Sequence, residues 1–347
     1  MASTTVLPSG LLQLFGGEII AQFEQKNLLL PTTRVKTVSG GALSWQFPVI
    51  NLGVAKYHIA GDNLITASGY ADANDAMRGT ARTIFADRLL TCSNLIDNLR
   101  NVLDSFDSRG EYAKQLGSAL SLRMDQNIAQ VLTQASTLQR DNATAATPSA
   151  PGADAVGAIA IDTADTAGAA LVAGLFEAQS RLTQRNVPEE DRFCMIGPAQ
   201  AKLMFAEAAA MSGGLEWGNT QFSSAAATGR IPMLAGFKII VSNSIRNSAT
   251  TGTLNQQTAA LGVGSIANTN DYSVTIGGGY PWGGSTYTYP MLMALCYHQS
   301  AVGTVKVMDL AIETDRMVEY LADLVVAKLA VGHGVLRNES AVAILAA

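Results

Sequence analysis

The sequence predicts an α+β fold, and three observations support that prediction. Apolar residues recur at helical spacing over residues 108–138, and several other segments alternate in polarity or are rich in β-branched residues. Helical and extended segments also follow each other without an internal repeat or a clean βαβ series, which excludes a solenoid and a simple doubly wound sheet. With 347 residues the chain has room for one large domain or for two to three smaller ones.

The N-terminal part predicts a loose tail over residues 1–10, followed by a short amphipathic helix, LLQLFGGEIIAQFEQ. We expect a break or bend at Gly16-Gly17, because each glycine costs a helix about 1 kcal/mol. Residues 33–59 are extended in character, with TRVKTV and LSWQFPVI separated by a turn at Ser39-Gly40-Gly41. Residues 60–80 are polar, and TARTIFADRLLT is extended again. Two extended segments around a polar tip predict a long projecting hairpin.

The strongest local pattern predicts a helix over residues 108–138. Ser108 and Glu111 form a Ser-x-x-Glu capping box, and apolar residues from Tyr112 to Ala135 follow at helical spacing. Thirty-one residues at 1.5 Å rise span roughly 45 Å. A helix of that length with one apolar stripe must lie against a sheet or another helix.

The later segments alternate between helical and extended character. Residues 141–170 are small, contain Pro and Gly and predict an exposed connection. Residues 247–290 carry a single charge, Asp271, and predict β-structure or long loops. The other expected elements are a helix near 164–185, a strand at 192–197, a helix at 198–211 opened by Pro198, a strand in GFKIIVSNSI, an extended CYHQSAVGTVKVMDLAIETD, and a helix in MVEYLADLVVAKLAVGHG that ends at Gly332 and Gly334.

Composition argues against sequence-specific nucleic-acid binding. The formal net charge is −5, and no run of Lys or Arg occurs, whereas DNA-binding surfaces are basic. If this protein associates with DNA, we therefore expect it to enclose the DNA without binding it tightly. Charged residues make up only 15% of the chain, which suits a protein that covers much of its surface with neighbours.

The cysteines and the N-terminus point to a soluble protein made in the cytoplasm. Cys92, Cys194 and Cys296 are odd in number and far apart in the sequence, so we expect neither a disulfide framework nor a zinc ribbon, but small buried thiols in a reducing compartment. The first ten residues do not resemble a secretory signal. No stretch reaches the ~20 apolar residues of a membrane-spanning helix.

The sequence shows no motif for catalysis or for binding a metal or cofactor. His58, His298 and His333 form no close Cys/His cluster that could supply the four ligands of a zinc site. A phosphate-binding Gly-x-x-x-x-Gly-Lys-Ser/Thr motif and a Gly-x-Ser-x-Gly elbow are absent. Glu189-Glu190-Asp191 follows Pro188 and is typical of a solvated turn. We expect no catalytic, cofactor-binding or metal-binding residues, although distant carboxylates could still meet in the fold.

Alternating charges on the predicted hairpin are the one set of residues with a candidate binding role. They fit either an ordinary solvated surface or ion pairs that dock the hairpin on a neighbouring subunit, where such pairs set register and partner choice. These candidate contacts are Arg78, Arg82, Arg88, Asp72 and Asp75, together with Asp87.

Several segments together resemble the major capsid proteins of podoviruses of the T-seven type. The most specific is HQSAVGTVKVMDLAIETDRMVEYLADLVVAKLAVGHGVLR at residues 298–337, followed by FDSRGEYAKQLGSALSLRMDQ at 106–126. FGGEII, QFPVI, AGDNL, VPEEDRFCMIGP and AGFKIIVSNSI occur in the right order, so the resemblance covers nearly the whole chain. Ala60, Asn338 and Gly41 depart from the family pattern, which puts local geometry in doubt there.

The resemblance implies the tailed-phage major capsid fold of the Hong Kong type. Its parts would be an N-terminal arm at 1–43, an extended hairpin loop at 44–98, a peripheral domain with a long spine helix at 99–188 and 297–347, and an axial domain at 189–296. The return of the C-terminal segment to pack with the spine helix is also implied by the resemblance alone.

The implied function is that of a non-enzymatic shell subunit, assembled in the host cytoplasm and located in the virion. Its partners would be other copies in hexamers and pentamers, a scaffolding protein, a portal, a possible decoration protein and enclosed DNA, but no membrane. The resemblance also implies a scaffold-filled precursor that expands when DNA enters. The arm and hairpin would change conformation in this expansion, since neither is expected to bury much apolar surface in its own subunit. Deletion of residues 1–30 would then leave a folded subunit that fails to make uniform shells. The alternatives are an encapsulin-type nanocompartment shell and a soluble α+β enzyme.

Overall fold

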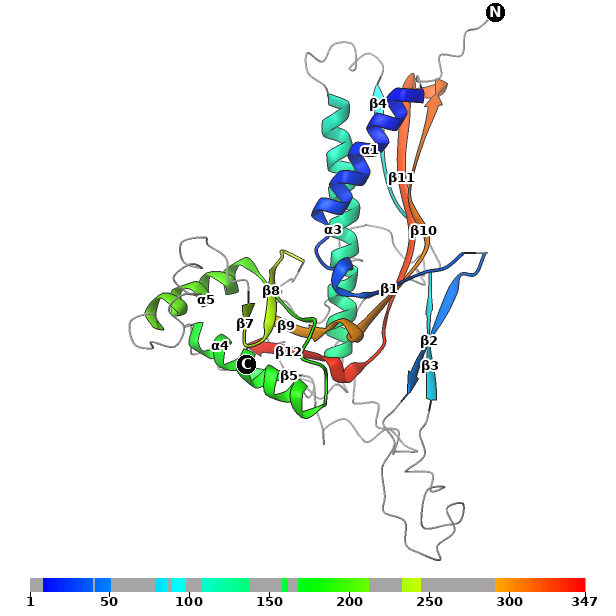
Figure 1. Cartoon of the computed structure of the whole chain (residues 1–347). Helices are drawn as coiled ribbons and strands as arrows, with labels where there is room; N and C mark the ends of the chain where they lie inside the picture. Colours follow the sequence, from blue (N-terminus) through cyan, green and yellow to red (C-terminus); the bar gives the residue numbers. More distant parts are fainter. Residues whose placement is uncertain are drawn as a thin grey trace, which may run out of the picture.

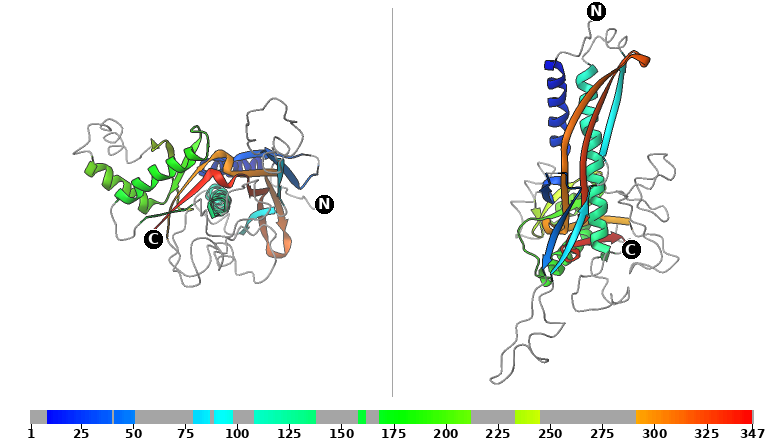
Figure 2. Two further views of the ribbon diagram at one scale, coloured as in Figure 1. Left: turned by 90° about the horizontal axis from the view of Figure 1, so that it is seen from below. Right: turned by 90° about the vertical axis from the view of Figure 1, so that its right-hand side faces the viewer.

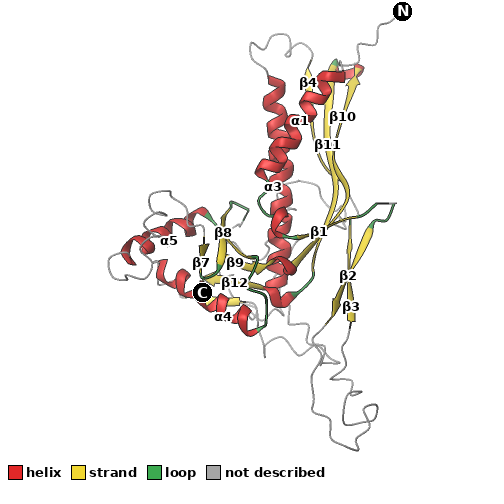
Figure 3. Cartoon of the chain, viewed as in Figure 1, coloured by secondary structure: helices red, strands yellow, loops and turns green. Residues whose placement is uncertain are grey.

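The computed structural model describes residues 9–39, 41–50, 79–86, 89–97, 108–137, 158–161, 168–211, 233–244 and 291–346. It contains both helices and sheets, which confirms the α+β prediction (Figures 1 and 3). The helices and 3-10 turns are α1 (Ser9–Lys26), η1 (Leu30–Thr32), α3 (Ser108–Thr137), α4 (Gly168–Gln184), α5 (Pro198–Met211), η2 (Gln299–Ala301), η3 (Val318–Tyr320) and η4 (Asn338–Ser340).

The described strands form three sheets, with orders β1-β10-β11-β4, β5-β12-β9-β6-β8-β7 and β2-β3. The strands are β1 (Arg34–Thr37), β2 (Ser44–Ile50), β3 (Gly79–Phe85), β4 (Leu89–Asp97), β5 (Ala158–Ile161), β6 (Arg192–Ile196), β7 (Met233–Leu234), β8 (Phe237–Val241), β9 (Met291–His298), β10 (Val302–Met317), β11 (Ala322–Val335) and β12 (Ala341–Ala346).

The long helix α3 lies along the four-stranded sheet, whose two central strands form an extended antiparallel ribbon (Figure 2). The predicted helix is therefore confirmed, with a start at Ser108 and an end at Thr137. Leu116 and Leu120 are buried against Ala327 and Leu329 of β11. This contact shows that the C-terminal part of the chain packs on the long helix, as the resemblance implied.

The predicted helix in MVEYLADLVVAKLAVGHG is wrong, because most of this segment is strand β11. Its residues pair with β10 on one side and with β4 on the other, so β11 is an interior strand. Alternate residues Val325, Ala327, Leu329 and Val331 are buried in one cluster with α3, which is the period of two expected of a strand. The segment thus gains ladder hydrogen bonds on both edges, and these override its helix-forming Ala, Leu and Lys residues.

The predicted break in the N-terminal helix is also wrong, because α1 is continuous through Gly16-Gly17. The helix packs on α3, and the close approach falls at Gly117. A Cβ at Gly117 would lie 2.7 Å from the carbonyl oxygen of Ile19. Tertiary packing on α3, with Ile19 fully buried, therefore offsets the low helix propensity of the glycine pair.

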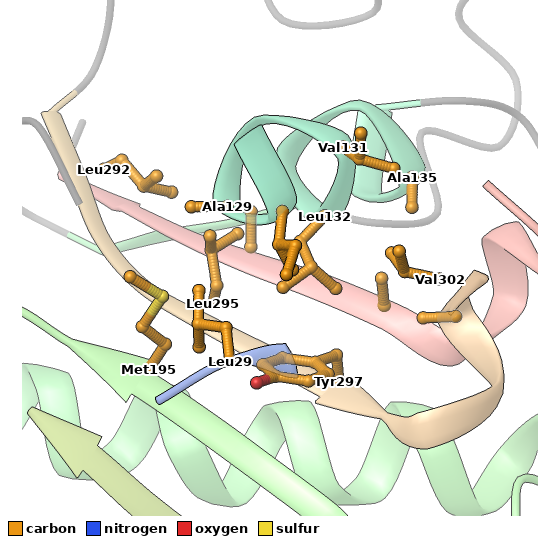
Figure 4. Close-up of a cluster of buried hydrophobic side chains, with 14 of the residues drawn as sticks. Leu29, Ala129, Val131, Leu132, Ala135, Met195, Leu292, Leu295, Tyr297 and Val302 are labelled. Atoms are coloured by element: carbon orange, nitrogen blue, oxygen red, sulfur yellow. The ribbon is translucent and has the colours of Figure 1, made fainter. Parts of the chain in front are cut away.

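The six-stranded sheet is covered on both faces. On one face, Met195, Leu295 and Ala343 lie in a cluster with Ile128 and Leu132 of α3 (Figure 4). On the other face, their chain neighbours Cys194, Ile196, Ala294, Cys296, Val342 and Ile344 lie in a cluster with Leu171, Leu175, Ala178 and Leu182 of α4. Burial on both faces explains why RFCMI, MLMALCYH and AVAILA are almost continuously apolar.

The predictions for α4, β6, α5 and β8 are confirmed, since these elements begin and end within a few residues of the expected bounds. The extended segments predicted on either side of residues 39–41 are confirmed as β1 and β2, which lie in different sheets. One expectation about a connection needs correction. The segment 141–170 is not purely a connection, since β5 lies within it and pairs in parallel with β12.

Several predictions concern residues outside the described ranges. These are the N-terminal tail up to residue 8, the end of the extended segment at 51–59, most of the polar tip predicted at 60–80, and the segments 141–157 and 247–290. The division into arm, hairpin, peripheral and axial domains stays a prediction.

Candidate assembly surfaces

A two-stranded hairpin projects from the main body of the molecule (Figure 1). Strands β2 and β3 pair in antiparallel register from Ser44 with Phe85 to Ile50 with Gly79, which confirms the predicted hairpin over its described part. Near its base, Phe47 and Ile84 are buried in a cluster with residues of β10 and the segment after β11. The hairpin is therefore held at its base by apolar contacts within the subunit.

Glycines allow the hairpin to approach β10 and β11 closely. A Cβ at Gly332 would collide with the backbone carbonyl of Phe85, and one at Gly334 would lie 2.8 Å from Ile84 Cγ1. A Cβ at Gly303, which pairs with Gly334 across the ribbon, would lie 3.0 Å from Ile84 Cδ1. Gly332 and Gly334, predicted to stop a helix, are instead the surface on which the hairpin base rests.

The structure places one of the predicted contact residues. Arg82 is half-buried on β3, where it pairs across the hairpin with Phe47. The other charged residues of the predicted set lie outside the described residues, so the alternating ion pairs stay a prediction. These residues are the arginines Arg78 and Arg88 and the aspartates Asp72, Asp75 and Asp87.

Exposed apolar side chains gather where the hairpin meets the sheet. Leu43 precedes β2, Phe85 ends β3 and Leu89 begins β4, and all three are exposed. The Lys36 ammonium lies 4.8 Å from the centre of the exposed Trp45 ring, a cation–π geometry. We call Leu43, Phe85 and Leu89 the hairpin-base surface. This surface is a candidate for contact with another molecule.

A second apolar surface lies at the opposite end of the β10–β11 ribbon. The turn between the two strands is η3, where Val318, Tyr320 and Leu321 are 74%, 65% and 67% exposed. Leu321 has φ 47°, a left-handed conformation that is strained for a leucine. We call these three residues the ribbon-tip surface. The ribbon tip does not follow from the sequence pattern, because that pattern predicts a helix here, and in a helix the same residues would not form a turn.

The segment after α1 is anchored to the core by buried hydrogen bonds. The carboxylate of Asp125 on α3 accepts the backbone N–H groups of Leu28 (3.2 Å) and Leu29 (3.1 Å). The Thr32 hydroxyl lies 2.8 Å from the Tyr297 hydroxyl. These contacts connect residues nearly a hundred or more positions apart and fix the path of the chain from α1 into β1.

A further buried chain of polar groups begins at Thr33. Its hydroxyl lies 3.2 Å from that of Thr304, which lies 2.9 Å from Nδ1 of His333. Together with the full burial of Ile19 and Leu29, these contacts correct an expectation. The described part of the arm does bury apolar surface in its own subunit, so the reason given for its mobility on expansion is wrong.

Burial shifts the pKa values of two groups in these anchors. Desolvation raises the pKa of Asp125 to about 6, although the N–H groups of Leu28 and Leu29 oppose the shift. Burial lowers the pKa of His333 to about 4, so its imidazole is neutral at pH 7. His298 is half-buried and its Nδ1 faces the Ser300 hydroxyl at 2.8 Å, as expected of a packed histidine.

The described residues bring together no recognisable set of groups for chemistry. Among them, no three His, Cys, Asp or Glu side chains converge as a metal site would require. Asp191 of the acidic run before β6 is exposed and pairs with Lys238 at 3.1 Å, as in a solvated turn. No helix in the described part of the chain combines the length and apolar character needed to cross a bilayer.

A family model described as Gp10A-like major capsid protein matches residues 46–345. The chain belongs to this family of major capsid proteins. It is therefore a structural subunit of a phage head and a component of the virion capsid. The predicted resemblance to capsid proteins of the T-seven type is confirmed.

Individual relatives agree with this assignment. This capsid protein is 29% identical over 342 residues to the major capsid protein of Enterobacteria phage T3, covering 96% of this chain and 90% of that one. It is 28% identical over 337 residues to the major capsid protein of Escherichia phage T7, covering 96% and 91%. Its fold is similar to the capsid structure of the cyanophage P-SCSP1u, with a TM-score of 0.66, 25% identity, and coverage of 91% and 86%.

These comparisons confirm the tailed-phage capsid fold, and phage relatives favour a head subunit over a nanocompartment shell.

Proposed function

We propose that this subunit assembles into hexamers and pentamers that close into an icosahedral head around double-stranded DNA. The observation that supports the proposal best is the pair of exposed apolar surfaces at opposite ends of the β10–β11 ribbon. Exposed apolar side chains that lie together mark interaction surfaces, and interface cores are enriched in aromatic residues such as the exposed Phe85 and Tyr320.

The separation of the two surfaces favours ring-like contacts. The ribbon-tip surface follows β10, whereas the hairpin-base surface packs beside Gly332, near the other end of the ribbon. The eleven residue steps from Leu321 to Gly332 at about 3.3 Å each correspond to roughly 36 Å. Each surface would therefore contact a different patch on a neighbour. Such heterologous contacts generate rings when the rotation closes.

The subunit would act mechanically and not as an enzyme. Its net charge of −5 disfavours tight DNA binding, so packaged DNA would be held by the closed shell. The proposed partners, besides other copies, are a scaffolding protein, a portal and a possible decoration protein. Each would use surface that the free subunit leaves open.

Electron microscopy tests the proposal. The full chain, produced with and without the scaffolding protein of its phage, is imaged in negative stain, and particles from infected cells are treated with nuclease. We expect closed shells of uniform diameter with the scaffolding protein, and nuclease-protected genomic DNA in the particles. Protein that stays monomeric under both conditions would contradict the proposal, and shells that enclose a co-purifying enzyme would indicate a nanocompartment instead.

A further inference from the structure

Two cysteines far apart in the sequence lie in contact in the core of the six-stranded sheet. Cys194 of β6 and Cys296 of β9 are directly opposite each other in the antiparallel pairing, and their Sγ atoms are 3.6 Å apart. Both side chains are fully buried between the sheet and α4. All three cysteines of the chain are free thiols, and Cys92 on β4 belongs to another cluster.

The backbone geometry at this pair is suited to a disulfide. Directly opposite residues in an antiparallel ladder have Cα atoms about 4.5 or 5.5 Å apart. Both separations lie within the range of about 4.4–6.8 Å found in disulfides. Side chains of such a pair also point to the same face of the sheet. Bond formation therefore requires rotation of the side chains about χ1, with no need for the strands to move apart.

The same burial keeps the pair reduced in the new subunit. Desolvation and the facing sulfur of Cys194 raise the pKa of Cys296, so little reactive thiolate is present. A bulky disulfide such as oxidised glutathione cannot reach fully buried sulfurs without unfolding of the sheet. Hydrogen peroxide is close to water in size, so it can reach such a site during small local openings.

We propose that Cys194 and Cys296 form a latent intrasubunit disulfide, reduced at synthesis and closed by peroxide after the head leaves the reducing cell. One thiol is deprotonated during opening, and its sulfur attacks an oxygen of peroxide and releases hydroxide, which leaves a sulfenic acid. The second sulfur displaces the hydroxyl group of that sulfenic acid. The balance is two thiols and one hydrogen peroxide to one disulfide and two water molecules.

The disulfide would link β6 to β9 and close a loop of about a hundred residues that contains the whole 247–290 segment. Long loops gain most from such a link, because the unfolded chain loses more conformational freedom. A shell outside the cell cannot replace damaged subunits. Slow formation of the disulfide would therefore stabilise each subunit after protein synthesis has ended.

Peptide mapping of the wild-type chain tests the proposal. Assembled particles are incubated with millimolar hydrogen peroxide, quenched, denatured with an alkylating reagent and digested with trypsin without reductant. We expect residues 193–202 linked to residues 247–306, with a mass lower by two hydrogen atoms than the sum of the separate peptides. The link should disappear on reduction. The oxidised chain should also unfold at a higher guanidinium concentration than the reduced chain.

Cys92→Ser is the matched control, because it keeps the pair intact. In this variant the number of free thiols per denatured chain should fall from two to none after peroxide. In Cys194→Ser no intrasubunit link should form. The proposal is overturned if both cysteines of wild-type particles are recovered alkylated, or as sulfinic or sulfonic acids, after Cys92 has been oxidised.

Discussion

His333 and Asp125 respond to pH in opposite directions. The unfolded chain protonates histidine near pH 6.5, whereas buried His333 takes up a proton only near pH 4. Falling pH between these values therefore favours the unfolded state. Asp125 holds its proton below about pH 6 in the native state, but only below about pH 3.8 when unfolded. Over that range falling pH favours the native state.

We expect single substitutions to separate these two opposing effects. A tenfold change in proton affinity is about 1.4 kcal/mol, so each group contributes on the order of 3 kcal/mol across its range. His333→Gln should reduce the loss of stability between pH 6.5 and 4, and Asp125→Asn should make that loss steeper. The measurement is the free energy of unfolding of the unassembled subunit at several pH values. Parallel curves for wild type and both variants would contradict the assignment.

At the scale of elements, the sequence predicted the long helix α3, which a local pattern determines. It did not predict strand β11, which depends on pairing with other strands. The helix α3 was found because its capping residues, period and apolar stripe agree. Strand β11 was missed because Leu321, Leu324, Val325 and Leu329 also fit helical spacing, and only pairing with β10 and β4 decides between the two. The ribbon-tip surface was lost with it, since the turn exists only if both flanking segments are strands.

The glycines also show that the sequence alone does not reveal tertiary contacts. Gly332 is required for a close contact with the hairpin, whereas Gly17 has no such contact. We expect Gly332→Ala to displace the hairpin base, since its Cβ would collide with the Phe85 carbonyl. Gly17→Ala is the matched control: no atom lies within 4 Å of its Cβ, and it should stabilise α1 by about 1 kcal/mol. Amide hydrogen exchange over residues 44–50 and 79–85 should increase only in Gly332→Ala. Unchanged protection there would refute the role of Gly332.

At the scale of the whole molecule, the arm belongs to the folding unit of the subunit. Deleting residues 1–30 would remove Ile19 and Leu29 from two buried clusters and leave Asp125 without its N–H partners. Because domains are stable by only about 5–15 kcal/mol, we now expect this truncation to misfold, contrary to the expectation from sequence.

Adjacent residues on α1 provide a milder test of this conclusion. Ile19→Ala should lower the free energy of unfolding by about 2–5 kcal/mol, because Ile19 is fully buried. Ile20→Ala, at an exposed position on the same helix, should change it by less than about 1 kcal/mol. Denaturant unfolding of the two variants measures the difference, and equal values would show that α1 contributes little to the fold.

The ribbon-tip surface allows stability and assembly to be separated. Asparagine tolerates the left-handed conformation better than leucine, so Leu321→Asn should stabilise the unassembled subunit by up to about 1 kcal/mol. The same change removes an exposed apolar side chain from the proposed interface and should lower the yield of closed shells. Leu122→Gln, which removes an exposed leucine from α3, is the control for a general effect of surface polarity. Unfolding curves and shell counts by electron microscopy give the two readings. If the ribbon tip contacts a neighbour, the free energy of unfolding should rise and the shell yield should fall in Leu321→Asn, and this combination should not occur in Leu122→Gln. A normal shell yield in Leu321→Asn would show that the tip is not part of the interface.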